Sequence, residues 1–461
     1  MIDLYIVCIT YREGEFMSNN DVKQPRKLKA EMWDRMQFLF RNYYDRMIHF
    51  YLKFDKPLDF SALSKAYKYV VDRITVLHSS FINSPVTPYW KINYDYSESD
   101  IIVLKQAEDE KQAHDMAFDF LTQEIPVKAK VQIQAAVIRY EGGDILVQVL
   151  NHMCMDGQDT KEVLMLVAKA YEQLMAGKEI DVEVKDGDRS HYQCYTLYNE
   201  EERKQALGLY KNVSQVKHQI KFPYTKRNHK VDKSRILRRV IGKEKFAALK
   251  DMSKKAGVTL NDVLLTAYMR SLYRACNIDK DSNISVPCMV DLRRHIKGGK
   301  SFGFSNHIGF MICTAHGYKD DYLKMFEDIK KQSDEAKDDP FFGLYSLPLL
   351  NLAYKLFPQC LAEIAIGIGY NNPYTGMSNL GLLKEQDFAF NSQTPSDLFL
   401  TGAVKSIPYL QLAVSTYKGE MTLTIAVKCK DEDEKRLNAF IDDIVAEMDN
   451  MMEKVTPALE N

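Results

Sequence analysis

Apolar residues in the first part of the chain recur at helical and strand spacing. Between residues 26 and 44 they return every three or four positions, which predicts an amphipathic helix. A strand is expected over residues 49–54. A second amphipathic helix is expected after Asp59 and Ser61, because short polar residues of this kind favour helix starts.

A hairpin is the clearest strand signal. Apolar residues alternate with polar or small ones over residues 131–137, which is typical of a half-buried strand. Residues 145–150 are almost continuously apolar, as in a strand covered on both faces, and residues 141–144 form the tight turn between the two. We therefore expect the second strand to be central. A helix should begin after Asp159, with Glu162 completing its capping box.

The second part of the chain predicts a separate lobe. Periodicity is poor before residue 235, so we expect a linker over residues 186–235 between lobes formed by residues 1–185 and 236–461. The elements expected after the linker are helices near 246–255, 259–272 and 432–454, strands at 284–289 and 308–314, and a hairpin at 410–427. Helices and strands mixed in this way favour an α+β fold with mixed sheets, although no sequence repeat relates the halves.

Length and charge narrow the function classes. A chain of 461 residues is too long for one ordinary core and suits two domains. Its formal net charge of −1 argues against a nucleic-acid partner, which needs a basic excess. The eight cysteines are scattered and form no Cys-x-x-Cys pair. We therefore expect no metal and no disulfide framework, with free thiols in a reducing cytoplasm.

We expect neither a signal peptide at the N-terminus nor a membrane span. The first ten residues are apolar but lack a basic start, and either Met1 or Met17 could be the true initiator. The uncharged stretch 364–383 is long enough to cross a bilayer. Its asparagines and proline would leave polar groups unsatisfied in lipid, so we expect a buried loop and strand and no membrane span.

Candidate chemistry is concentrated in residues 151–157, between the buried strand and the next helix. A histidine at the end of a central strand has a rigid base, so His152 could act as a general base near neutral pH. Asp156 supplies a carboxylate that could hold the turn, and Gly157 allows the chain to change direction. The alternative interpretation is a satisfied loop histidine beside a turn-forming Asp-Gly pair.

This pattern resembles a known family. His152-x-x-x-Asp156-Gly157 resembles the His-x-x-x-Asp-Gly motif of the CoA-dependent acyltransferase superfamily, which has the chloramphenicol acetyltransferase-like fold. Its members include peptide-synthetase condensation domains and alcohol acetyltransferases. Other segments resemble the family's motifs in the same order: 77–81, 257–262, 287–293, 303–306 and 378–381.

The resemblance implies two lobes that meet at a tunnel, with His152 near its centre. Nε2 of His152 would take a proton from a hydroxyl or amine as it attacks a thioester carbonyl. Ser378 is the candidate donor to the oxyanion. In the family the motif Asp faces away from substrate and pairs with an Arg, so Asp156 and Arg293 would be structural partners.

The resemblance also implies substrates. Acyl-CoA would be a co-substrate rather than a bound cofactor, and the acceptor a small alcohol or amine. Condensation domains usually have two adjacent histidines where this chain has Asn151 and His152, and we expect no fused carrier domain. Both points favour O-acylation. Two alternatives stay open: a stand-alone condensation enzyme that uses acyl-carrier-protein thioesters, and a catalytically idle binding or scaffold relative.

One segment of the chain is strongly basic. Residues 217–245 carry eleven cations and two anions, a net charge of +9. Lys226, Arg227 and Lys230 could attract the phosphates of CoA, or an acidic carrier protein, towards the tunnel. The alternative is a solvated linker with no binding role.

Three further groups of residues have weaker claims to a function. Cys154 is disfavoured as a nucleophile, because two residues so close in a loop rarely reach catalytic geometry with each other. His295 and His307 could line the tunnel, although surface or packing roles are favoured. Tyr370 and Tyr374 could shape an acceptor channel, but core packing explains aromatic residues equally well.

Overall fold

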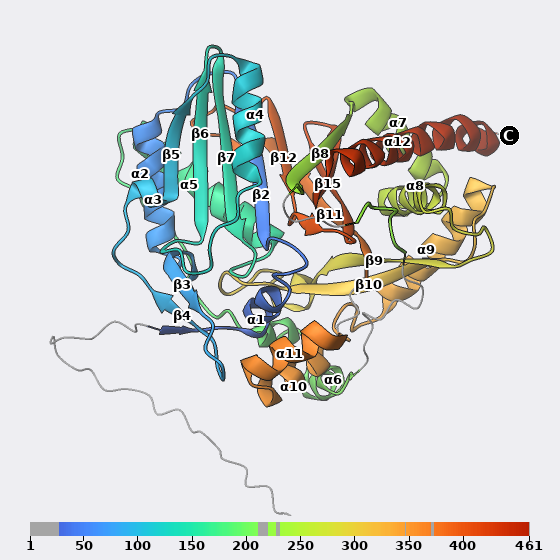
Figure 1. Ribbon diagram of the computed structural model, residues 1–461, viewed down its shortest axis with the longest axis horizontal. Helices are drawn as coiled ribbons and strands as arrows, with labels where there is room; N and C mark the ends of the chain where they lie inside the picture. The colour runs from blue at the N-terminus through green and yellow to red at the C-terminus, as the bar shows by residue number, and fades with distance from the viewer. Residues whose placement is uncertain (1–26, 211–219, 227–230, 346, 370–372, 461) are drawn as a thin grey trace, which may run out of the picture.

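The computed structural model describes residues 27–210, 220–226, 231–345, 347–369 and 373–460. Two sheet-centred lobes lie side by side, each with helices packed on its sheet (Figure 1). Both lobes mix helices with sheets, which confirms the expected α+β class and matches the expected pair of lobes.

The N-terminal lobe contains a five-stranded sheet in the order β12-β2-β7-β6-β5. Its strands are β2 (Met47–Phe54), β5 (Ile102–Gln106), β6 (Ile133–Tyr140), β7 (Gly143–Asn151) and β12 (Asp397–Thr401). Every residue of β7 is buried, and β7 pairs antiparallel with both β2 and β6. The predicted hairpin with a central second strand is therefore confirmed.

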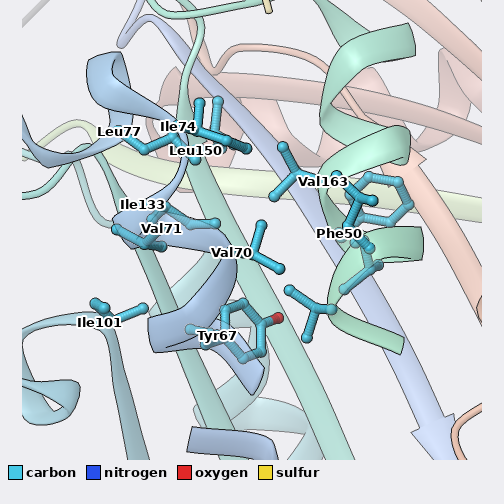
Figure 2. Close-up of a cluster of buried hydrophobic side chains, with 14 of the residues drawn as sticks. Phe50, Tyr67, Val70, Val71, Ile74, Leu77, Ile101, Ile133, Leu150 and Val163 are labelled. Carbon is cyan, nitrogen blue, oxygen red and sulfur yellow. The ribbon is translucent and has the colours of Figure 1, made fainter. Parts of the chain in front are cut away.

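Helices cover both faces of this sheet. On one face lie α2 (Phe60–Asp72) and α5 (Gly157–Met175), and on the other lies α4 (Glu110–Leu121). The apolar stripe of α2 faces inwards, and Tyr67 and Val70 pack among residues of the sheet and of α5 in the core (Figure 2). The same core includes Leu150, one residue before the end of β7, so the strand that leads to His152 is rigidly held.

A small three-stranded sheet lies beside this lobe. Its strands are β1 (Lys27–Lys29), β3 (Ser79–Ile82) and β4 (Tyr89–Ile92), and the nearby short helices are α1 (Met32–Leu39), η1 (Thr75–His78) and α3 (Glu98–Ile101). The helix expected over residues 26–44 is much shorter, because residues 27–29 pair with β4 and Glu31 caps α1 in a capping box with Asp34.

The C-terminal lobe is built on a seven-stranded mixed sheet in the order β10-β9-β11-β14-β15-β13, with β8 also paired to β15. The strands are β8 (Lys233–Ile241), β9 (Ile284–Asp291), β10 (Ile308–Ala315), β11 (Thr375–Leu383), β13 (Lys405–Ser406), β14 (Leu410–Tyr417) and β15 (Glu420–Cys429). The main helices that accompany it are α7 (Lys243–Lys255), α8 (Leu260–Ala275), α9 (Tyr322–Asp338) and α12 (Asp431–Glu460).

The chain crosses between the two lobes near its end. Strand β12 pairs antiparallel with β2, so residues 397–401, expected in the C-terminal lobe, complete the N-terminal sheet. Strand β13 follows four residues later and pairs with β15 of the other sheet. The segment between β12 and β13 therefore runs along the junction of the lobes.

The remaining elements are η2 (His191–Tyr195), α6 (Glu200–Leu207), η3 (Leu292–His295), α10 (Leu347–Leu356), α11 (Gln359–Gly369) and η4 (Glu385–Phe388). The uncharged stretch 364–383 was expected to form a loop and a strand. Its first part instead continues helix α11, and its second part forms β11 as expected. Among the described residues, every helix is either too short or too polar to cross a bilayer.

Candidate active site

His152 directly follows β7, where backbone contacts from two other segments hold it in place. Its N–H donates to the carbonyl of Arg46 at 2.7 Å, and Nδ2 of Asn306 donates to its carbonyl at 2.9 Å. Arg46 belongs to the N-terminal lobe, and Asn306 immediately precedes His307 and β10 of the C-terminal lobe. Both lobes therefore fix the backbone at His152.

The surroundings of His152 favour a neutral imidazole. Burial lowers its pKa below the ordinary value, and the charge of Lys405 lowers it further, whereas Asp156 and Asn306 act in the opposite direction. Its Nδ1 is buried. At neutral pH the side chain can therefore accept a proton, as a general base must.

Asp156, and not Asp159, begins the helix that follows. Helix α5 starts at Gly157, and Oδ1 of Asp156 accepts hydrogen bonds from the N–H groups of Gln158 and Asp159 at 3.0 and 3.2 Å. The expected capping box at Asp159 is wrong because Asp159 lies inside the first turn. Its side chain accepts instead from the N–H of Ser305 at 2.8 Å.

Arg293 lies across the lobe junction from Asp156, where the resemblance placed its partner. It forms two parallel hydrogen bonds with Asp156, both 3.0 Å long, and contacts Asp159 at 2.7 Å. Burial alone would raise the pKa of Asp156, but Arg293 outweighs it and holds that pKa low. Burial raises the pKa of Asp159, because the opposing charge of Arg293, which also contacts Asp156, compensates for burial only in part. Asp156 therefore serves as a buried anchor.

Gly157 lies on the wall of the site. Its backbone angles lie outside the left-handed region, so the turn itself does not require glycine. A Cβ atom there would lie 3.5 Å from Cδ2 of Leu380, in ordinary contact. The prediction that the turn requires glycine at position 157 is therefore wrong. The missing side chain instead leaves space at the wall of the site.

A cavity of about 390 Å³ lies beside His152, between the lobes. We call it the main cavity. Its lining from the N-terminal lobe includes His152, Asp156 and Gly157, and its lining from the C-terminal lobe includes Arg293 and Ser378. These five residues, singled out from the sequence, therefore surround one space. Whether that space is a tunnel open at both ends stays a prediction.

Four of the eight cations of the basic segment that the structure describes are paired with carboxylates. Arg239 and Lys245 pair with carboxylates of α12, and Arg235 contacts Asp431 and Glu434. Lys226 is exposed, whereas Arg227 and Lys230 lie outside the described residues. The net charge of +9 counted along the sequence therefore overstates the charge that this segment presents.

Of the two histidines and the cysteine considered from the sequence, His307 is the one that lines the main cavity. His307 lines the main cavity, and its N–H donates to Oδ2 of Asp156 at 2.8 Å. The ring of His295 contacts the Tyr198 hydroxyl at 2.6 Å and the Phe342 carbonyl at 2.8 Å instead. Burial raises the pKa of the Cys154 thiol well above its ordinary value, which disfavours a thiolate nucleophile.

Lys405 is the main residue that sequence reasoning missed. It lines the main cavity, and its charge acts on His152. The signal available in the sequence was weak: Lys405 is the one charged residue between Asp397 and Lys418. A lone lysine in an apolar run does not reveal whether it faces solvent or a cavity.

The family follows from a comparison with family models. The condensation domain model matches residues 36–347, about two thirds of the chain. The chain belongs to the condensation domain family. No curated protein sequence is similar enough to count as a match.

Solved structures of condensation domains and their relatives share the fold. The epimerization domain from the third module of tyrocidine synthetase B is 13% identical with a TM-score of 0.65, covering 94% of this chain and 98% of that chain. The SgcC5 protein from Streptomyces globisporus is 14% identical with a TM-score of 0.65, at 92% and 99% coverage. The starter condensation domain of rhizomide synthetase, solved as a mutant in complex with C8-CoA, is 14% identical with a TM-score of 0.63, at 93% and 95% coverage.

Proposed function

We propose that this condensation domain family member transfers an acyl group from a thioester to a hydroxyl or amine acceptor, with His152 as the general base. Family membership supports acyl transfer in general. The observation that carries the specific assignment is the partly buried His152 on the wall of the main cavity, with its pKa below the ordinary value.

The reaction follows from that geometry. Nε2 of His152 takes the proton of the acceptor as its oxygen or nitrogen forms a bond to the thioester carbonyl carbon. The carbonyl becomes an oxyanion, for which we propose Ser378 as the hydrogen-bond donor, because it lines the same cavity. The oxyanion then collapses, the carbon–sulfur bond breaks, and the imidazolium returns the proton to the departing thiolate.

Acyl-CoA is the proposed donor. The starter condensation domain that shares this fold was solved with C8-CoA. A carrier-protein thioester is the second candidate donor, because condensation domains form the family of this chain.

The preference for a hydroxyl acceptor rests on Asn151, which stands where condensation domains usually have the first of two histidines. Its side chain donates to Oε1 of Gln132 at 2.7 Å and accepts from the N–H of Met153 at 3.0 Å. The Asn151 side chain therefore stabilises the turn that follows β7.

The test is a two-by-two assay. The full chain is given octanoyl-CoA or an octanoyl-loaded carrier protein, each with a panel of alcohols and amines, and acyl transfer is followed by mass spectrometry. Esters formed from octanoyl-CoA support the favoured reaction, and amides formed only from the loaded carrier support the alternative. Absence of transfer in every arm would refute both enzymatic assignments and favour an idle relative.

A further inference from the structure

A second cavity adjoins the main cavity and is strongly apolar. This side chamber has a volume of about 190 Å³. It shares several wall residues with the main cavity: Trp33, Phe40, Tyr44, Met289, Phe310, Lys405 and Gln411. The rest of its wall comes mainly from apolar side chains, including Leu349 and Leu350 of α10. At about 30 Å³ for each water in the liquid, it has room for about six waters or a small apolar group.

Lys405 is the one charged residue in the described wall of the side chamber. Because it also lines the main cavity, it lies where the two spaces meet. Its Nζ lies 4.1 Å from the centroid of the Tyr44 ring, and Tyr44 lines both spaces as well. The ammonium is therefore held at the junction by a cation–π contact.

This ammonium lacks an anionic partner within the described part of the chain. It has no carboxylate within 4.0 Å there, and the charge of Asp45 acts on it only from a greater distance. Burial lowers the pKa of Lys405 to about 8, so the side chain still carries its charge at neutral pH. The Lys405 side chain is partly buried. A charge that is partly withdrawn from water and has no partner is costly, and an anionic ligand would lower that cost.

The other strong cation of the main cavity is already neutralised. Arg293 contacts Asp156, Asp159 and Asp291 within 3.1 Å. Lys161, which also lines the main cavity, donates to the Leu380 carbonyl at 3.1 Å. Lys161 does not line the side chamber, so an anion bound at the mouth of that chamber meets Lys405 as the cation in its described wall.

We propose that the side chamber and Lys405 together bind a substrate that carries a carboxylate next to an apolar group. The carboxylate would pair with the ammonium of Lys405, and the apolar group would fill the side chamber. A plain acyl chain fits this site poorly, because it would cover the ammonium without pairing it. That this substrate is the acyl acceptor rests on the proposed function; that the site binds such a molecule does not.

The first test measures binding without any acyl donor. Isothermal titration calorimetry compares 3-phenyllactate, its methyl ester and lactate on the full chain. The wild type should bind 3-phenyllactate about tenfold or more tightly than the ester, because a charge-assisted hydrogen bond is lost in the ester. Lactate, which lacks the apolar group, should bind more weakly than 3-phenyllactate.

Variants assign the preference to Lys405. Lys405→Met should abolish the preference for acid over ester, and Lys405→Arg should keep part of it. Lys435→Met is the matched control, since Lys435 is exposed on α12, and it should leave the preference intact. Equal affinity for acid and ester in the wild type, or an unchanged preference in Lys405→Met, would overturn the proposal.

Turnover separates this proposal from the proposed function. With octanoyl-CoA as donor, Lys405→Met should raise the KM for 3-phenyllactate relative to its ester. An equal fall in kcat for both acceptors would instead indicate a role at the oxyanion and would overturn the assignment. If the acid binds through Lys405 but is not acylated while other acceptors are, the binding site stands and its assignment as the acceptor site fails; if no acceptor of the panel is acylated, the proposed function fails and the binding site still stands.

Discussion

The ion pair between Asp156 and Arg293 offers a sharp test of how the active-site loop is held. In Asp156→Asn, the side chain keeps nearly the same shape but loses its charge. One oxygen remains to accept from the first turn of α5. The new amide group, however, replaces the oxygen that accepts from Arg293 and from the N–H of His307 at 2.8 Å.

The size of the effect follows from burial. The side chains of Asp156 and Arg293 are 4% and 8% exposed, so the pair is almost completely out of water. Breaking such a pair on one side costs about 3–5 kcal/mol. Because Asp159 still contacts Arg293 at 2.7 Å, we expect the lower end of that range, a loss of about 3 kcal/mol in the free energy of unfolding.

The matched control is Asp291→Asn. Asp291 contacts the same arginine at 3.1 Å, but its side chain is 54% exposed. An exposed pair contributes about 0–1 kcal/mol, so this variant should be nearly as stable as the wild type. Urea unfolding followed by circular dichroism measures both variants. Equal losses in the two variants would refute the reasoning that burial of the Asp156–Arg293 pair sets its contribution.

Three further expectations concern the reaction. Because the pKa of His152 is lowered, its neutral form predominates at neutral pH, and kcat/KM should fall only as the pH drops through a midpoint below 6.5. A midpoint above 6.5 in the pH–rate profile would contradict this. Ser378→Ala should lower kcat about 10²–10³-fold in steady-state assays if its hydroxyl serves the oxyanion, and an unchanged kcat would exclude that role. Replacing Lys226, Arg227 and Lys230 with Ala should raise the apparent Kd of acyl-CoA at low salt but not at high salt, and equal affinities at low salt would favour a solvated linker.

Local patterns predicted the strands around His152 well. The contrast between an alternating strand and a continuously apolar one identified β7 as central, because that contrast depends only on which faces are buried. The start of α5 was harder to predict. Asp156 and Asp159 are both chemically suitable caps. In the fold, Arg293 donates to Asp156 and the N–H of Ser305 donates to Asp159, and both contacts come from residues distant in the sequence.

Charge illustrates the same limit. The charges of the basic segment could be counted along the sequence, but most of their partners lie on α12, roughly 200 residues away, as in the contact between Arg239 and Asp442. Lys405 shows the converse. Its sequence neighbours are uncharged, and only the crossing of the chain from β12 to β13 brings it to the cavity beside His152.

The central claim is that His152 acts as the base in acyl transfer. The most direct measurement is the kcat/KM of His152→Ala with the donor and acceptor that the two-by-two assay identifies. His316→Ala is the control, because the His316 side chain is 55% exposed and paired with Asp328. We predict a fall of about 10²–10⁴-fold in His152→Ala and wild-type turnover in the control. Undiminished transfer by a folded His152→Ala variant would contradict the account.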